Sequence, residues 1–181
     1  MPAPTPPAVL QPILKYLHSL KDQRADLELL QRMLTESKVT LDDVRDYLCY
    51  KDDCYCRNLV AESPMFNMLV LCWKSGQRSP IHDHAHSVCA FKVLEGVCSE
   101  TSYAFSPCGQ VVPVRTRDFL KGEIVASHDS ETHQVSNLQP EGQCLVTLHI
   151  YSPPLKTMKV FSIMGSKGGE WLAPEHAAIG A

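Results

Sequence analysis

The spacing of apolar residues divides the chain into a helical N-terminal part and a longer part with the period of β-strands. Between residues 9 and 20, apolar side chains recur at intervals of three and four, which predicts an amphipathic helix. The same pattern predicts a second helix over residues 25–34 and a third over residues 40–48. Thr40 and Asp43 occupy the capping-box positions of the third helix, so we expect the Thr40 hydroxyl to cap its free amides.

From about residue 56, short apolar runs rich in β-branched and aromatic residues alternate with turn-forming residues. The candidate strands are FNMLVLCW, VCAFKVLEG, QVVPVRTRDF, EIVASH, HQVSN, CLVTLHIYSP and KVFSI. Evenly spaced short strands predict an antiparallel barrel or a double-sheet jelly roll. We therefore expect a mainly β protein with one domain over residues 1–181. Its expected parts are a helical layer (1–50), the barrel (55–165) and a Gly-rich tail that forms a loop or a fraying end (166–181).

Composition narrows the classes of function. A chain of 181 residues can bury one sizeable core, and its net charge of −3 without a basic cluster argues against nucleic acid as the main partner. No apolar run reaches the length of a membrane span. The N-terminal residues lack the features of a signal peptide, so the eight cysteines are expected to be thiols. We expect a cytoplasmic monomer.

Histidine spacing supplies the first sign of chemistry. His82 and His84 stand one residue apart, and alternate side chains of a strand share one face. Both imidazoles can therefore reach one metal ion, and His133 in a second, similar segment offers a third. Three neutral imidazoles bind a transition metal and leave coordination positions open for reactants. The pattern predicts a metal-dependent enzyme.

Two segments, GQRSPIHDHAHSVCAFKVLEG and GEIVASHDSETHQVSN, resemble the paired signature of the cupin superfamily. The anchors of the first motif are Gly76, His82, His84, Cys89 and Gly96, and those of the second are Gly122, His133 and Asn137. Most cupins have glutamate at the position of Cys89. A cysteine there is similar to the thiol dioxygenases, and within them to the cysteine dioxygenase family. That resemblance extends through RNLV, LCW, SPIHDH and TLHIYSPP.

The resemblance implies a cupin jelly-roll barrel that binds Fe(II) through His82, His84 and His133. It implies oxidation of L-cysteine by O2 to cysteine sulfinic acid, without a further organic cofactor. Arg57 matches the family arginine that binds the substrate carboxylate, and Tyr55 matches a tyrosine that assists it. A guanidinium fork suits such a planar anion.

The resemblance also implies roles for residues on a later strand. Tyr151 matches the active-site tyrosine, which in several members is joined to the cysteine at the position of Cys89 by a thioether. Thr147 and His149 alternate with Tyr151, so all three face inward on one strand, where the threonine orients the histidine and the histidine holds the tyrosine hydroxyl. The Ser152–Pro153 bond matches a family cis peptide, which the small cis penalty of X-Pro bonds permits.

Several alternatives remain open. Members of the 3-mercaptopropionate dioxygenases carry glutamine where this chain has Arg57, and a metal-bearing cupin can sense a small thiol without turnover. Cys89 can be a small buried apolar residue, and Arg57 can pair with a surface acid. Val88 replaces a histidine of the mammalian pattern, and Met158 replaces a cysteine, the latter as we expect of a bacterial member.

Overall fold

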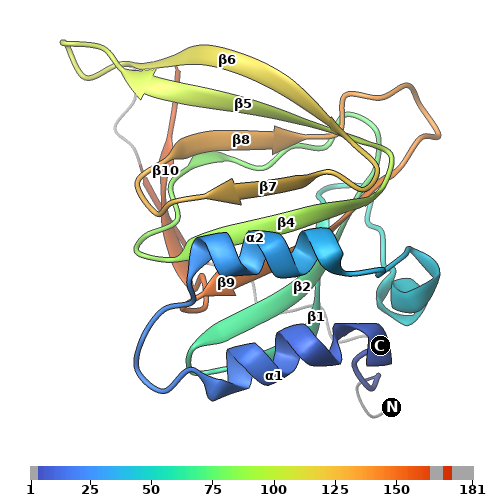
Figure 1. Ribbon diagram of the computed structural model, residues 1–181. Helices are drawn as coiled ribbons and strands as arrows, with labels where there is room; N and C mark the ends of the chain where they lie inside the picture. Colours follow the sequence, from blue (N-terminus) through green and yellow to red (C-terminus); the bar gives the residue numbers. More distant parts are fainter. Residues whose placement is uncertain (1–3, 164–168, 173–181) are drawn as a thin grey trace.

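The computed structural model describes residues 4–163 and 169–172 (Figure 1). The helical segments are η1 (Ala8–Leu10), α1 (Gln11–Ser19), α2 (Leu27–Glu36) and η2 (Asp42–Tyr47), of which η1 and η2 are 3-10 helices. The strands are β1 (Cys56–Ser63), β2 (Phe66–Trp73), β3 (Ile81–His82), β4 (Val88–Glu95), β5 (Val97–Phe105), β6 (Val111–Leu120), β7 (Ile124–Ser127), β8 (Thr132–Ser136), β9 (Leu145–Ser152), β10 (Thr157–Phe161) and β11 (Gly169–Leu172).

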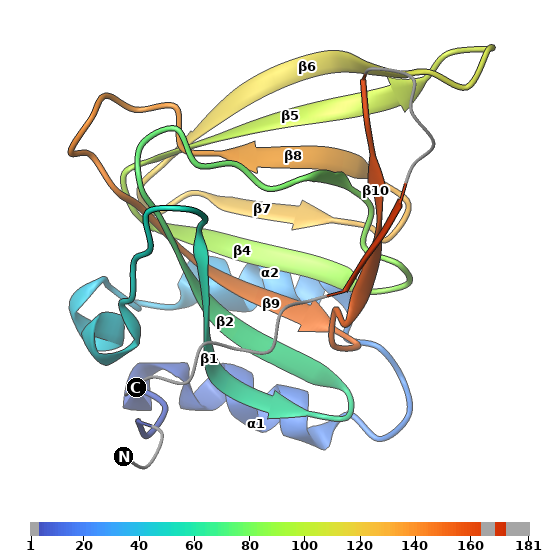
Figure 2. The ribbon, with the colours of Figure 1, turned by 180° about the vertical axis from the view of Figure 1, so that it is seen from behind.

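The strands form two antiparallel sheets. One has the order β1-β2-β9-β4-β7 and the other the order β11-β10-β3-β8-β5-β6. Helices α1 and α2 cover the outer face of the first sheet, and Figure 2 shows the second sheet curving over its other face. The prediction of a mainly β jelly roll with a small N-terminal helical layer is confirmed.

Strand β2 is apolar without interruption because both of its faces are covered. Met68 and Val70 pack against the helices in one apolar cluster, whereas Leu69 and Leu71 belong to a second cluster inside the barrel. All eight residues of the strand are buried. A sheet enclosed on both sides has continuous hydrophobic strands rather than alternating ones.

Helix α2 is fixed to the barrel at its C-terminal end by Lys92 of β4. The ammonium group of this buried lysine donates to the backbone carbonyls of Leu34, at 3.1 Å, and Ser37, at 2.6 Å. Carbonyls at the end of a helix lack partners within it and attract a cation. At the other end, the carboxylate of Asp26 accepts the N–H of Leu29 at 2.9 Å, which satisfies a free amide.

The predicted third helix needs correction. Residues 42–47 form a short 3-10 helix, and the Thr40 hydroxyl does not cap it. Instead the Asp43 carboxylate accepts hydrogen bonds from the Thr40 backbone N–H, at 2.8 Å, and from its hydroxyl, at 2.7 Å. The hydroxyl is thus used as a donor. The first two helices lie where the pattern placed them, within about two residues.

The sequence pattern missed four strands, β1, β3, β5 and β11. Strand β3 has only two residues, and the middle of β5 is the polar run SETS at residues 99–102, so neither forms an apolar run. Strand β11 pairs with β10, so the loop expected for the tail is wrong at residues 169–172, and the rest of the tail lies outside the described residues. The division into one domain over 1–181 stays a prediction.

Two further expectations concern the whole chain. All eight cysteines are free thiols, as expected. Within the described residues, no helix is long and apolar enough to cross a membrane.

Candidate active site

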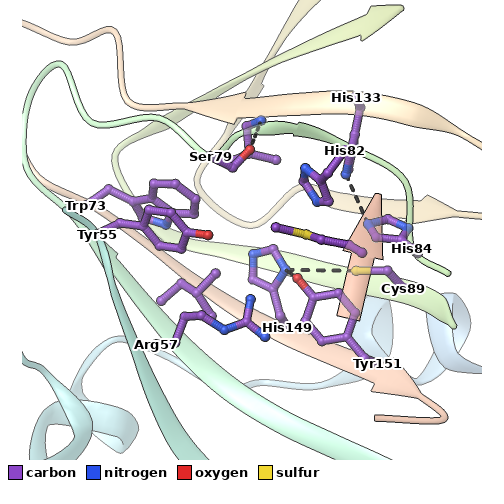
Figure 3. A pocket seen from close by; sticks show the side chains of 13 residues that line it. Tyr55, Arg57, Trp73, Ser79, His82, His84, Cys89, His133, His149 and Tyr151 are labelled. Atoms are coloured by element: carbon purple, nitrogen blue, oxygen red, sulfur yellow. Dashed lines mark hydrogen bonds between the residues drawn. The ribbon is translucent and has the colours of Figure 1, made fainter. Parts of the chain in front are cut away.

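A pocket inside the barrel brings together most of the residues singled out from the sequence (Figure 3). Its lining residues are Tyr55, Arg57, Leu71, Trp73, Ser79, His82, His84, Cys89, His133, Val135, His149, Tyr151 and Met158. They come from strands of both sheets, from the segments just before β1 and β3, and from the loop after β3. Thr147, the remaining candidate, does not line the pocket but contacts the Nε2 atom of His149 through its hydroxyl group.

The three histidines meet at one end of this pocket. His82 of β3 and His133 of β8 are direct partners across the two strands. Strand β3 ends at His82, so His84 lies in the following loop, and the expectation that both histidines share a strand is wrong. Asp83 between them turns away and accepts from the backbone N–H of Ala85, at 3.2 Å, and of Lys159, at 3.1 Å. This contact leaves the two imidazoles facing inward.

The imidazole nitrogens form a donor set that fits a metal ion. One ligand atom from each of His82, His84 and His133 lies within 4.8 Å of the others, and all three residues are buried. Within the described residues this is the one such group. The Nε2 atoms of His84 and His133 face each other at 3.0 Å. At this distance one ring can donate its Nε2–H to the other, and the same two nitrogens can both bind a metal ion once that hydrogen lies on the other nitrogen of its ring.

Burial keeps the imidazoles of His82 and His84 neutral, the form that binds metals. Burial, with the neighbouring His133 imidazole as a second cause, lowers the pKa of His82 to about 3. Burial likewise lowers the pKa of His84 well below its ordinary value. The Nδ1 atom of His82 donates to the Pro80 carbonyl at 2.9 Å, which leaves its Nε2 atom as the metal ligand.

Glu100 of β5 is a site residue that the sequence analysis missed. Its carboxylate accepts from the Nδ1 atom of His133 at 2.5 Å, and its side chain is 13% exposed. A carboxylate in this position fixes the orientation of a ligand histidine and makes its other nitrogen a better ligand. In the sequence, Glu100 is only one acidic residue in a segment without an apolar run, so nothing there pointed to a role in the site.

Arg57, at the start of β1, lies inside the pocket and is only 6% exposed. Its guanidinium carbon lies 5.5 Å from the centre of the Tyr151 ring. Burial raises the pKa of Tyr55, and the positive charge of Arg57 opposes that rise. Tyr55 stacks on Trp73, with ring centres 4.0 Å apart. This buried position disfavours the alternative of Arg57 as a surface ion-pair partner.

Cys89 and Tyr151 are direct partners on the adjacent strands β4 and β9. The Cys89 sulfur lies 3.9 Å, and the Tyr151 hydroxyl 3.2 Å, from the same Nδ1 atom of His149. Burial raises the pKa of the Cys89 thiol and that of the Tyr151 phenol, so both groups stay protonated. The peptide bond between Ser152 and Pro153 that follows is cis, as expected.

Thr147, His149 and Tyr151 form a hydrogen-bonded series that we call the relay. The Nε2 atom of His149 lies 2.9 Å from the Thr147 hydroxyl oxygen, and its Nδ1 atom contacts the Tyr151 hydroxyl. Burial lowers the pKa of His149 well below its ordinary value, so the ring is neutral. Phe91 stacks on this ring at 4.4 Å. The inward alternation expected from the sequence is confirmed.

Comparison with known proteins adds to this geometry. A family model described as "Cysteine dioxygenase type I" matches residues 2–164. The chain is 30% identical to "Cysteine dioxygenase type 1" of Danio rerio over 166 residues and to that of Homo sapiens over 160 residues. Each match covers 86% of this chain and 80% of the relative. A solved double-stranded β-helix protein from Klebsiella pneumoniae has a TM-score of 0.52 at 18% identity, covering 86% of this chain and 100% of that one; this likeness concerns the fold.

Proposed function

Because this chain belongs to the cysteine dioxygenase type I family, we propose that its pocket binds L-cysteine between a metal centre and Arg57. The chain is a thiol dioxygenase, and the proposed reaction adds both atoms of O2 to the thiol sulfur to give cysteine sulfinic acid. One observation carries the proposal. A buried triad of histidines and a buried arginine line the same small pocket, which suits a molecule with a thiol and a carboxylate.

The proposed metal is Fe(II), held by His82, His84 and His133. All three ligands are neutral, so an iron ion there keeps its full charge and favours an anionic thiolate. When bound, iron supplies the redox chemistry by which O2 reacts with the thiolate. The Glu100 carboxylate supports this set by holding the ring of His133 in place.

Arg57 and Tyr55 are proposed to bind the substrate carboxylate. Arg57 always carries a charge, and its planar fork can donate two parallel hydrogen bonds to a carboxylate. Stacking on Trp73 fixes the Tyr55 ring beside it. Holding the carboxylate at one end and the thiolate at the other places the sulfur in one orientation, which converts binding energy into rate.

Tyr151 and His149 are proposed to act beside the bound sulfur. The relay holds the Tyr151 hydroxyl in the pocket, where it can donate a hydrogen bond to substrate or O2. We also propose that Cys89 and Tyr151 become joined by a thioether during turnover. Forming this bond removes one hydrogen from the thiol and one from the phenol ring, and one O2 takes up both hydrogens and their electrons as hydrogen peroxide.

The two rival functions are not favoured. A 3-mercaptopropionate dioxygenase is disfavoured by the buried Arg57, and the match to cysteine dioxygenases disfavours a non-catalytic sensor. The complete site lies within one chain, so we propose that the enzyme works as a monomer. The eight free thiols agree with a reducing compartment, and we propose the cytoplasm.

Isotope labelling tests the reaction. The iron-loaded protein is supplied with L-cysteine and ¹⁸O2, and the product is identified by mass spectrometry. We expect cysteine sulfinic acid with two labelled oxygens and uptake of one O2 for each molecule formed. Cystine or hydrogen peroxide as the main product, or label in one oxygen only, would contradict a dioxygenase reaction.

A further inference from the structure

The relay ends on a group to which the sequence analysis gave no role. The indole N–H of Trp73 in β2 donates to the hydroxyl oxygen of Thr147 at 3.1 Å. Thr147 is fully buried and Trp73 is 1% exposed. Tryptophan donates hydrogen bonds and accepts none, whereas a hydroxyl group and a neutral imidazole can each do both. Trp73 is therefore the one member of the series whose hydrogen-bond direction cannot change.

This fixed donor determines the role of Thr147. Its hydroxyl oxygen already accepts the indole hydrogen, and its own hydrogen needs an acceptor. Among the described residues, the acceptor within reach is the Nε2 atom of His149, at 2.9 Å. The opposite arrangement, in which His149 donates to Thr147, leaves a buried hydroxyl hydrogen without a partner and is disfavoured. Thr147 thus donates to Nε2.

The donor at Thr147 determines which atoms donate in the next two hydrogen bonds of the relay. A neutral His149 that accepts at Nε2 carries its proton on Nδ1. That proton is donated to the Tyr151 oxygen, 3.2 Å away. With its oxygen serving as acceptor, the Tyr151 hydroxyl keeps its hydrogen for a partner in the pocket.

We propose that the indole N–H of Trp73 fixes the direction of the relay, so that the Tyr151 hydroxyl donates its hydrogen into the pocket. Trp73 is a positioning residue, since it acts through Thr147 and His149 rather than on the reacting atoms. The direction of the relay follows from the hydrogen bonds alone. Its effect on catalysis rests on the proposed function.

The direct test is the tautomer of His149. Long-range ¹H–¹⁵N spectra of histidine distinguish the two neutral tautomers, and diamagnetic Zn(II) in place of iron keeps the signals of the full chain sharp. The His149→Asn variant identifies the signals by their loss. We expect the Nδ1–H form in the unmutated protein. A protonated Nε2 would overturn the proposal, and turnover is not needed for this result.

Two substitutions test the cause. Trp73→Phe removes the indole N–H but keeps a ring to stack on Tyr55. Because Thr147 then no longer accepts a hydrogen bond from a fixed donor, we expect a mixture of His149 tautomers. Phe91→Leu is the matched control, because it changes packing on the His149 ring without removing a hydrogen bond, and we expect the Nδ1–H form to persist. If Trp73→Phe kept the unmutated tautomer, the indole would not fix the direction. Should that variant fail to fold, Thr147→Ser, which keeps the hydroxyl, and Thr147→Val, which removes it, test the same point.

Kinetics with L-cysteine give a second measurement. Loss of one neutral hydrogen bond predicts a fall in kcat of about three- to tenfold for Trp73→Phe, with KM nearly unchanged because the stacking ring remains. In a Thr147→Val background the same change should lower kcat no further, since the hydroxyl that it acts through is absent. An independent, additive loss would contradict the proposal. No oxidation of cysteine by the unmutated protein would instead refute the proposed function and leave the tautomer result intact.

Discussion

Replacing Arg57 by alanine separates a substrate-binding arginine from a structural one. The side chain is 6% exposed and lies in the pocket beside Tyr55 and Tyr151, so a carboxylate bound there is largely removed from water. Loss of one partner from a buried charge pair costs about 2–5 kcal/mol, whereas an exposed pair is worth at most about 1 kcal/mol. Burial therefore predicts a loss of about thirty-fold to several-thousand-fold in kcat/KM for cysteine, against less than about sixfold for an exposed pair.

The assay is initial O2 uptake over a range of cysteine concentrations, with iron content measured on the same samples. Iron content should stay unchanged, because Arg57 is not a ligand. Arg45→Ala, a change at an exposed arginine in η2, is the matched control and should retain kcat/KM within about twofold. An Arg57→Ala variant within tenfold of the unmutated enzyme would refute the reasoning. Arg57→Gln should lose less against 3-mercaptopropionate than against cysteine, because an amide can still donate to its carboxylate.

The remaining predictions concern the metal, the thioether and acid stability. His133→Ala should abolish turnover and reduce bound iron, whereas His86→Ala, at a side chain that is 94% exposed, should change neither; normal iron content in the first variant would refute the ligand assignment. After many turnovers, peptide mass spectrometry should show Cys89 and Tyr151 in linked peptides lighter by two hydrogens, and Cys89→Ala should keep part of its activity; complete absence of the linked peptide would contradict the cross-link. Since burial lowers the pKa of His82 from 6.5 to about 3, the unfolded metal-free chain binds a proton that the folded chain does not, and stability is lost as the pH falls through this window. Urea titrations of the metal-free protein should show a loss of about 2 kcal/mol from His82 between pH 7 and pH 5, and an unchanged free energy of unfolding over that range would contradict this.

Most residues that line the pocket could be predicted from the sequence, because their identification depends on local spacing along the chain. Alternation along one strand places Thr147, His149 and Tyr151 on a single face wherever that strand lies. The histidines were identified by the spacing of two motifs. The strand assigned to His84 was wrong, because β3 ends one residue after Ile81 and no periodicity can report so short a strand.

The supporting contacts were not predictable in this way. Glu100 and Trp73 reach the site from β5 and β2, and their partners are 33 and 74 residues away in the chain. Only the pairing of strands and the packing of the two sheets bring them together. A single acidic residue or tryptophan in a sequence carries no information about such a partner, so these roles required the three-dimensional structure.

The central claim is that this pocket oxidises L-cysteine in preference to other small thiols. The most direct measurement couples O2 uptake to sulfinate formation by the iron-loaded protein with cysteine, 3-mercaptopropionate and cysteamine as separate substrates. We expect the highest kcat/KM for L-cysteine and a clear loss for cysteamine, which lacks the carboxylate that Arg57 is proposed to bind. An equal or higher kcat/KM for 3-mercaptopropionate or cysteamine would contradict it.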